Sequence, residues 1–213
     1  ARVVTPAGLH GALAGLTDTT ITASDTVIFA DVTDSNALKE DTVQGILDLA
    51  GGGAWNIIGT AVASASASLT ITGLDSTYDT YMLIGADLVP ATDNVDLWMR
   101  LGDSSGIDSG ASDYGYRSES TEAGFTADAI NSAGSFSAAQ MLINSDSASG
   151  PGNAAGEGIG FTALLTRPGD GTMRPSMHGY MTFWDPSTQL TAGAFHGGRN
   201  AVITLDRILI QFA

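Results

Sequence analysis

The stretch Tyr78–Leu101, YDTYMLIGADLVPATDNVDLWMRL, contains the pattern that decides the fold. Within residues 78–88, the set Tyr78, Thr80, Met82, Ile84, Ala86 and Leu88 alternates with the set Asp79, Tyr81, Leu83, Gly85 and Asp87. From Val95 to Leu101, every second residue is apolar. A period of two is typical of β-strands, in which successive side chains point to opposite faces of a sheet. The stretch therefore predicts two successive strands.

Further runs of the same kind follow on both sides. The expected strands are residues 54–64, 68–74, 114–117, 138–144, 158–166, 176–184, 189–195 and 201–212. The last run changes phase near Asp206, which suggests a bulge, and residues 118–137 show no clear pattern. Strands do not alternate with helices, which argues against a parallel α/β fold. We predict that residues 54–213 form an antiparallel β-sandwich of the jelly-roll type.

Residues 1–53 have a different character and form a short α/β arm in our interpretation. Thr5-Pro6 is a typical helix start, residues 19–22 and 26–32 are strand-like, and a turn is expected at residues 23–25. Asp41 and Gln44 have the spacing of a capping box at the start of a second helix. Gly51–Gly53 end that helix and mark the predicted domain boundary.

The two expected helices of this arm each place apolar residues on one face. A segment of about fifty residues cannot bury such surface within itself, so it must pack on other protein. We predict that this arm drives attachment or oligomerisation. The residues expected to carry that contact are Leu9, Leu13, Leu16, Val43, Ile46 and Leu47.

Composition supports a β-rich chain with many turns. The 213 residues include 27 glycines and 19 aspartates, but only four glutamates and one lysine, Lys39. Glutamate and lysine decorate helix surfaces, whereas glycine and aspartate favour turns. The net charge of −15 makes nucleic acid and anionic membrane surfaces improbable partners. No apolar run approaches the ~20 residues of a membrane helix, so membrane insertion is not expected.

Motifs of catalysis and of metal binding are weak in this sequence. Gly102–Gly106, GDSSG, fits the G-x-S-x-G motif of serine hydrolases, but no helical pattern follows it, which favours a hairpin loop. Glu119, Glu122 and Glu157 could form a glycosidase pair, although nothing in the sequence brings two of them together. Asp103 and Asp108 lack the spacing of a calcium-binding EF-hand.

Cysteine is absent and only three histidines occur, which disfavours disulfides and zinc sites. We therefore predict no catalytic residue, no cofactor and no metal site, and classify the protein as a non-enzyme.

A few residues remain candidates for ligand binding. Trp98 lies in the phase opposite to the apolar face of its strand, where it could stack on a sugar or lie in a subunit interface. His196 and Arg199 belong to a predicted polar loop, HGGRN, that could contact a ligand.

Two segments resemble structural proteins of tailed bacteriophages. Residues 17–53, with the run DSNALKEDTVQGILDLAGGG, are similar to connector segments of tail-fibre-like proteins. Residues 78–117 are similar to β-sandwich modules of the same proteins, and the turn at 167–171 and the run 203–212 echo the end of such modules.

The resemblance implies a protein of the virion that forms a homotrimer and contacts other virion proteins. A tail-fibre or receptor-binding component, which could contact a host surface glycan, is our leading interpretation. The alternatives are a capsid decoration protein (cement or head fibre), a glycan-active depolymerase, and a glycan-binding module without turnover.

Overall fold

The computed structural model describes residues 22–31, 35, 37–49, 55–123, 129–145 and 150–212. The chain divides into two compact units, Ala1–Ile57 and Ile58–Ala213. Leu9, Leu13 and Leu16, the expected first helix and most of the expected strand 19–22 lie outside the described residues.

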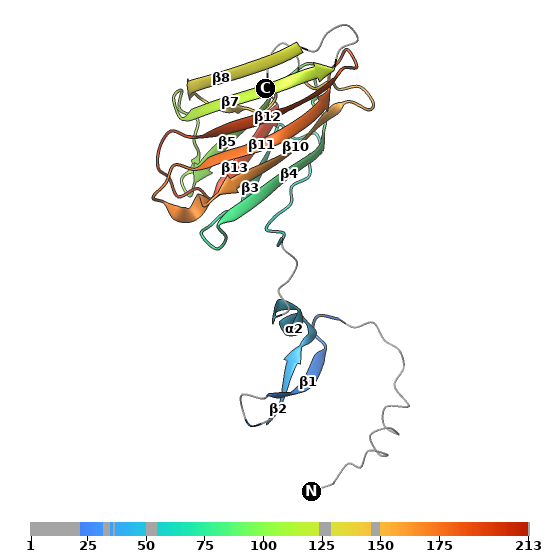
Figure 1. Cartoon of the computed structure of the whole chain (residues 1–213), viewed down its shortest axis with the longest axis vertical. Helices are drawn as coiled ribbons and strands as arrows, with labels where there is room; N and C mark the ends of the chain where they lie inside the picture. The colour runs from blue at the N-terminus through green and yellow to red at the C-terminus, as the bar shows by residue number, and fades with distance from the viewer. Residues whose placement is uncertain are drawn as a thin grey trace. The chain divides into compact units, whose positions relative to one another are not determined.

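The first unit contains a β-hairpin followed by a short helix (Figure 1). Strands β1 (Thr26–Asp31) and β2 (Ala37–Thr42) pair antiparallel, with Ile28 opposite Glu40. Helix α2 (Val43–Leu49) follows β2 directly, and the Thr42 Oγ1 accepts a hydrogen bond of 2.9 Å from the Gly45 amide. Thr42 is therefore the N-cap, and the expected capping box from Asp41 is wrong.

The second unit is a β-sandwich of two antiparallel sheets, which confirms the predicted β-sandwich. Its elements are β3 (Ser68–Thr72), β4 (Thr80–Leu88), β5 (Leu97–Asp103), β6 (Gly106–Ile107), β7 (Tyr114–Ala123), β8 (Ala129–Ala138), β9 (Met141–Leu142), β10 (Gly158–Thr166), the 3-10 turn η2 (Pro168–Asp170), β11 (Ser176–Trp184), β12 (Leu190–Arg199) and β13 (Arg207–Phe212).

One sheet has six strands in the order β4-β10-β11-β12-β7-β8. The other has the order β3-β13-β5-β6, and β9 also pairs with β5. Figure 1 shows the six-stranded sheet in front, with β13, β5 and β3 behind it. The strand pairs that the structure describes are all antiparallel, which allows each sheet to bury one face against the other and expose its second face.

The core lies between these two sheets. On β5, Leu97, Met99 and Leu101 are fully buried, whereas Trp98 and Arg100 between them are partly exposed. The six-stranded sheet contributes Phe161 and Phe195, whose rings meet edge to face with centroids 6.2 Å apart. The aromatic and aliphatic core thus explains why this unit can fold around its own residues.

Several sequence expectations need correction. Residues 55–64 form no strand, and the run 201–212 contains a strand only from Arg207, so its change of phase marks a strand start and not a bulge. The expected strand 138–144 is not continuous: Ala138 ends β8, and only Met141 and Leu142 form a further short strand, β9. The uninterpreted residues 118–137 include most of β7 and β8, and β2 was not expected.

Candidate functional site

The three residues that sequence suggested as ligand-binding do not form one site. Trp98 lies on β5, partly buried, with its indole edge-on to Tyr116 at a centroid distance of 6.3 Å. The predicted loop at residues 196–200 is wrong, because strand β12 continues to Arg199. His196 and Arg199 lie three residues apart on this strand, so their side chains point to different faces of the six-stranded sheet. His196 is exposed, whereas only 13% of the Arg199 side chain is accessible.

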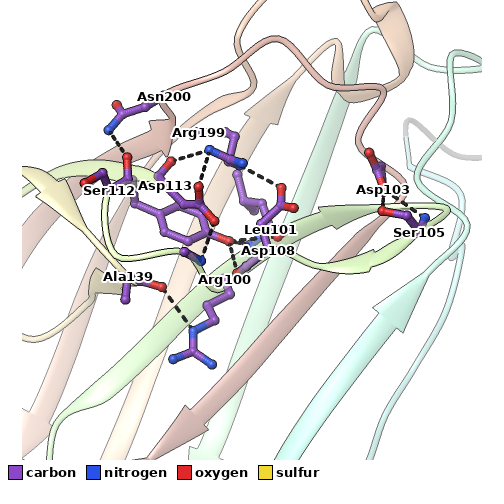
Figure 2. A network of polar contacts seen from close by, with 12 residues as sticks. Arg100, Leu101, Asp103, Ser105, Asp108, Ser112, Asp113, Ala139, Arg199 and Asn200 are labelled. Carbon is purple, nitrogen blue, oxygen red and sulfur yellow. Dashed lines mark hydrogen bonds and ion pairs between the residues drawn. The ribbon is translucent and has the colours of Figure 1, made fainter.

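Arg199 is the centre of a polar cluster at one end of the sandwich (Figure 2). Its Nε donates to Asp108 Oδ2 at 2.7 Å, and its Nη1 lies 3.0 Å from Asp113 Oδ1 and donates to the Asp113 carbonyl. The guanidinium also lies over the Tyr114 ring, 5.8 Å from its centroid. Burial lowers the pKa of Arg199, but the hydrogen bond from Arg199 to Asp108 and the charges of Asp108 and Asp113 raise it, and the net pKa is raised.

Tyr114 connects the same cluster to the opposite sheet. Its hydroxyl accepts a hydrogen bond from the Leu101 amide at 2.9 Å and lies 2.8 Å from the carbonyl oxygens of Leu101 and Asp108. Burial raises the pKa of the Tyr114 phenol to about 12. Because Tyr114 belongs to β7 and Leu101 to β5, this side chain joins the two sheets.

The cluster therefore acts as a structural clamp. Two carboxylates already hold the Arg199 guanidinium, which leaves it poorly placed to capture a ligand. Nearby, Asn200 fixes the same end by donating to the carbonyls of Ser112 and Phe136.

The GDSSG stretch forms the turn between β5 and β6. Ser105 donates both its amide and its hydroxyl to Asp103 Oδ1, at 2.8 and 2.6 Å (Figure 2). These bonds lower the pKa of the Asp103 carboxyl, the hydroxyl bond contributing most. A strand follows the turn, where the nucleophile elbow of a hydrolase requires a helix.

The glutamates considered as a catalytic pair lie apart in the fold. Glu119 and Glu122 are three residues apart on β7 and therefore point to opposite faces of the sheet. Glu119 forms an exposed ion pair of 2.7 Å with Arg117. Glu157 Oε2 accepts from the Ala154 amide at 2.7 Å and closes the turn before β10. Within the described part of the chain, no group of three or more metal-ligating side chains of His, Cys, Asp or Glu occurs.

The outer face of the six-stranded sheet carries exposed aromatic and imidazole side chains. His178 of β11 and His196 of β12 are cross-strand partners with stacked rings, 6.5 Å between centroids. Tyr180 and Trp184 share that face of β11, since the strand alternates exposed and buried residues.

A pocket of about 320 Å³ opens where β4, β10, β11 and β12 come together. It lies at the end of β12 opposite to Arg199, because Leu190 is the first residue of that strand. Its lining residues are Gly85, Ala86, Asp87, Gly156, Glu157, Gly158, Ile159, Gly160, Thr182, Phe183, Trp184 and Leu190. Among these lining residues the sequence had indicated only Glu157, as one of three glutamates that could form a glycosidase pair.

The first unit presents a different kind of candidate surface. Ile28 and Leu38 are 69% and 78% exposed, and Ile46 and Leu47 of α2 are also exposed, while Val43 is half-buried. Of the first-unit side chains that the structure describes, not one is buried. Apolar surface of this extent is typical of protein that contacts other protein.

Comparisons with models of protein families, with curated proteins and with solved structures find no significant match. In the described residues, no helix is both long enough and apolar enough to cross a membrane.

Proposed function

We propose that this chain is a structural protein of a bacteriophage particle that assembles as a homotrimer, with a role in tail fibres or receptor binding. Residues 1–53 provide the contacts between copies and with other virion proteins, and the β-sandwich provides the surface for the host. The resemblance of residues 17–53 and 78–117 to tail-fibre-like proteins supports this proposal.

The observation that carries the proposal is the exposed apolar surface of the first unit. Val27 and Phe29 lie on one face of the β1–β2 hairpin, and Ile28 lies on the other, because side chains alternate along a strand. Leu38 shares the face of Ile28, since its cross-strand partner is Ala30. Apolar side chains therefore occur on both faces of this two-stranded ribbon.

Within the described part of the first unit, the one helix, α2, has seven residues, too few to cover both faces of the hairpin. An isolated two-stranded ribbon is marginally stable at best in water and needs further strands or helices on an apolar face. A second copy supplies a matching apolar surface, since each chain contributes the same residues. Association between copies would remove these side chains from water, at about 25 cal/mol per Å² of apolar area.

The β-sandwich, in contrast, buries its apolar core within itself. Its core is buried between its own two sheets, with Leu97, Met99 and Phe183 almost inaccessible to solvent. From this contrast we infer that the arm mediates assembly and that the β-sandwich folds without contacts to other copies.

Charge substitutions on the hairpin test the proposal. In Ile28→Asp/Leu38→Asp, a carboxylate on each copy would enter the proposed apolar contact, so sedimentation velocity should show dissociation of the trimer. The control is Val202→Asp, which changes an exposed apolar residue of the β-sandwich and should leave the sedimentation coefficient unchanged. If the hairpin variant sediments like the unaltered protein, the hairpin does not hold copies together.

A further inference from the structure

The pocket beside Trp184 has a distinctive backbone. Opposite Gly160 of β10, β4 carries two residues, Ala86 and Asp87, which form a β-bulge. Asp87 has a φ of 52°, in the left-handed region that non-glycine residues seldom occupy. Bulges and such conformations recur at ligand-binding sites, because they re-aim side chains.

Missing side chains create the space within the pocket. Gly158 and Gly160 lie on β10 where a larger residue would project from the outer face of the sheet. A Cβ on Gly160 would meet only the Gly85 carbonyl oxygen, at 3.6 Å, which is ordinary contact. The glycine at position 160 therefore leaves open a space that a side chain could fill without a backbone clash.

The walls combine an aromatic surface with oxygen atoms. Trp184 and Leu190 are cross-strand partners in the β11–β12 hairpin, and the Trp184 side chain is 43% exposed. Thr182 and Asp87, both exposed residues with side-chain oxygens, also line the pocket. A ligand that fits such walls has an apolar face for the indole and hydroxyls for the carboxylate.

Charge narrows the class of ligand. Among the described residues that line the pocket, only Asp87 and Glu157 are charged, and both are acidic. The chain as a whole carries a net charge of −15. An anionic ligand would therefore be repelled, whereas a neutral polyhydroxylated ring would not.

We propose that this pocket binds a neutral hexose unit of a glycan. The sugar ring stacks on Trp184, and one of its hydroxyls donates a hydrogen bond to the Asp87 carboxylate. The inference rests on the host-contact role in the proposed function and names its site and ligand class. Pocket volumes of about 300 Å³ are at the lower end of the range for ligand sites, as expected for one or two sugar rings.

Tyr180 extends the proposed site along the sheet. It lies four residues from Trp184 on the same face of β11, about 13 Å away at ~3.3 Å per residue, and is 73% exposed. A longer glycan that follows β11 could reach both rings.

Titration of the full chain with neutral and anionic sugars tests the proposal. The probes are glucose, galactose, mannose, N-acetylglucosamine and rhamnose, the neutral disaccharides lactose and maltose, and anionic sialyllactose. Binding is followed by tryptophan fluorescence and by saturation-transfer NMR. We expect saturable binding of at least one neutral probe with a Kd of about 1 mM, and weaker binding of sialyllactose.

Four substitutions locate the binding. Trp184→Ala should weaken it at least tenfold, whereas Trp184→Phe, which keeps an aromatic face, should retain most of it. Gly160→Leu should block the pocket. Asp87→Asn, which tolerates the same backbone conformation, should weaken binding roughly fivefold.

Two further variants serve as controls. Trp55→Ala removes an exposed tryptophan outside the pocket and should have no effect on binding. Tyr180→Ala should weaken binding of a neutral oligosaccharide but not of a monosaccharide; equal effects on both would place Tyr180 inside the pocket contact and contradict its role as an extension.

Three results would overturn the inference: no saturable binding of any neutral probe up to about 50 mM, preferential binding of sialyllactose, or equal binding by the unaltered protein and Gly160→Leu. The oligomeric state is measured on the same samples. Binding by a monomer would refute the trimer and leave the pocket assignment intact, whereas a trimer without binding would refute only the pocket assignment.

Discussion

Arg199 and Asp108 form an ion pair of 2.7 Å that joins the end of β12 to the loop after β6. The two strands belong to different sheets, so the pair closes one end of the sandwich. Asp113 adds a second carboxylate at 3.0 Å from the same guanidinium. The carboxylates of Asp108 and Asp113 therefore hold the Arg199 guanidinium in place.

Loss of the Arg199 side chain should destabilise the sandwich. Arg199→Ala leaves Asp108 and Asp113 largely shielded from solvent without their shared cation, and we expect the free energy of unfolding to fall by about 2 kcal/mol. Urea denaturation followed by circular dichroism measures this change. The matched control is Arg117→Ala, which removes an exposed ion pair of β7 and should lower the free energy of unfolding by less than about 1 kcal/mol. Equal losses would contradict the clamp.

The Tyr114 hydroxyl should account for part of the alkaline unfolding. Burial raises its pKa from 10.0 to about 12 in the folded protein. A raised pKa means that the folded state holds the proton more tightly, so this stabilisation is complete below pH 10 and is lost as the pH rises through about 12.

Tyr114→Phe removes both the hydroxyl and its titration. We expect it to lower stability at neutral pH by about 1–2 kcal/mol, because the buried Leu101 amide loses its partner. Between pH 10 and 12, the melting temperature of the unaltered protein should fall more steeply with pH than that of the variant. Parallel pH profiles would show that Tyr114 ionises as freely in the folded chain as in the unfolded one.

Gly179 of β11 lies where this strand packs closely against β10 and β12. A Cβ on Gly179 would lie 2.6 Å from the Phe195 ring and closer still to the Thr162 carbonyl oxygen. Gly179→Ala should therefore separate these strands and cost about 1–3 kcal/mol of stability. Gly160→Ala in neighbouring β10 meets no such obstacle and should change the melting temperature little. A melting temperature for Gly179→Ala equal to that of the control would refute this packing.

Much of the sandwich could be predicted from the sequence, because periodic strands dominate it. The bounds of β10 and β11 agree with the expected residues 158–166 and 176–184. Period alone did not identify the buried face of β4. Tyr81 is buried there, whereas Met82 and Ile84 are exposed, since the bulge and the neighbouring strands decide which set faces the core.

Other elements depend on partners that are distant in the sequence. β8 consists largely of alanine, serine, glycine and asparagine, and pairs along β7; its strand character comes from that ladder and not from its composition. Conversely, residues 55–64 have the composition of a strand, which is why one was predicted there. They do not pair with another strand, so they form none.

The candidate sites were less accessible to sequence reasoning than the fold. Arg199 was selected for its polar loop, but its partners Asp108 and Asp113 lie about ninety residues away and hold it in a structural role. The pocket beside Trp184 arises from a bulge and a hairpin on separate strands. The signal that could have indicated it is the pair Gly158 and Gly160 within a strand, since glycine there often marks a bulge or close approach.

The mass of the full chain in solution tests the central claim most directly. Multi-angle light scattering of the purified protein should give about 65 kDa, three times the chain mass of 21.7 kDa, because copies cover the apolar hairpin and helix of the first unit. A stable mass near 21.7 kDa at all concentrations would show that this surface needs no second copy and would contradict the account.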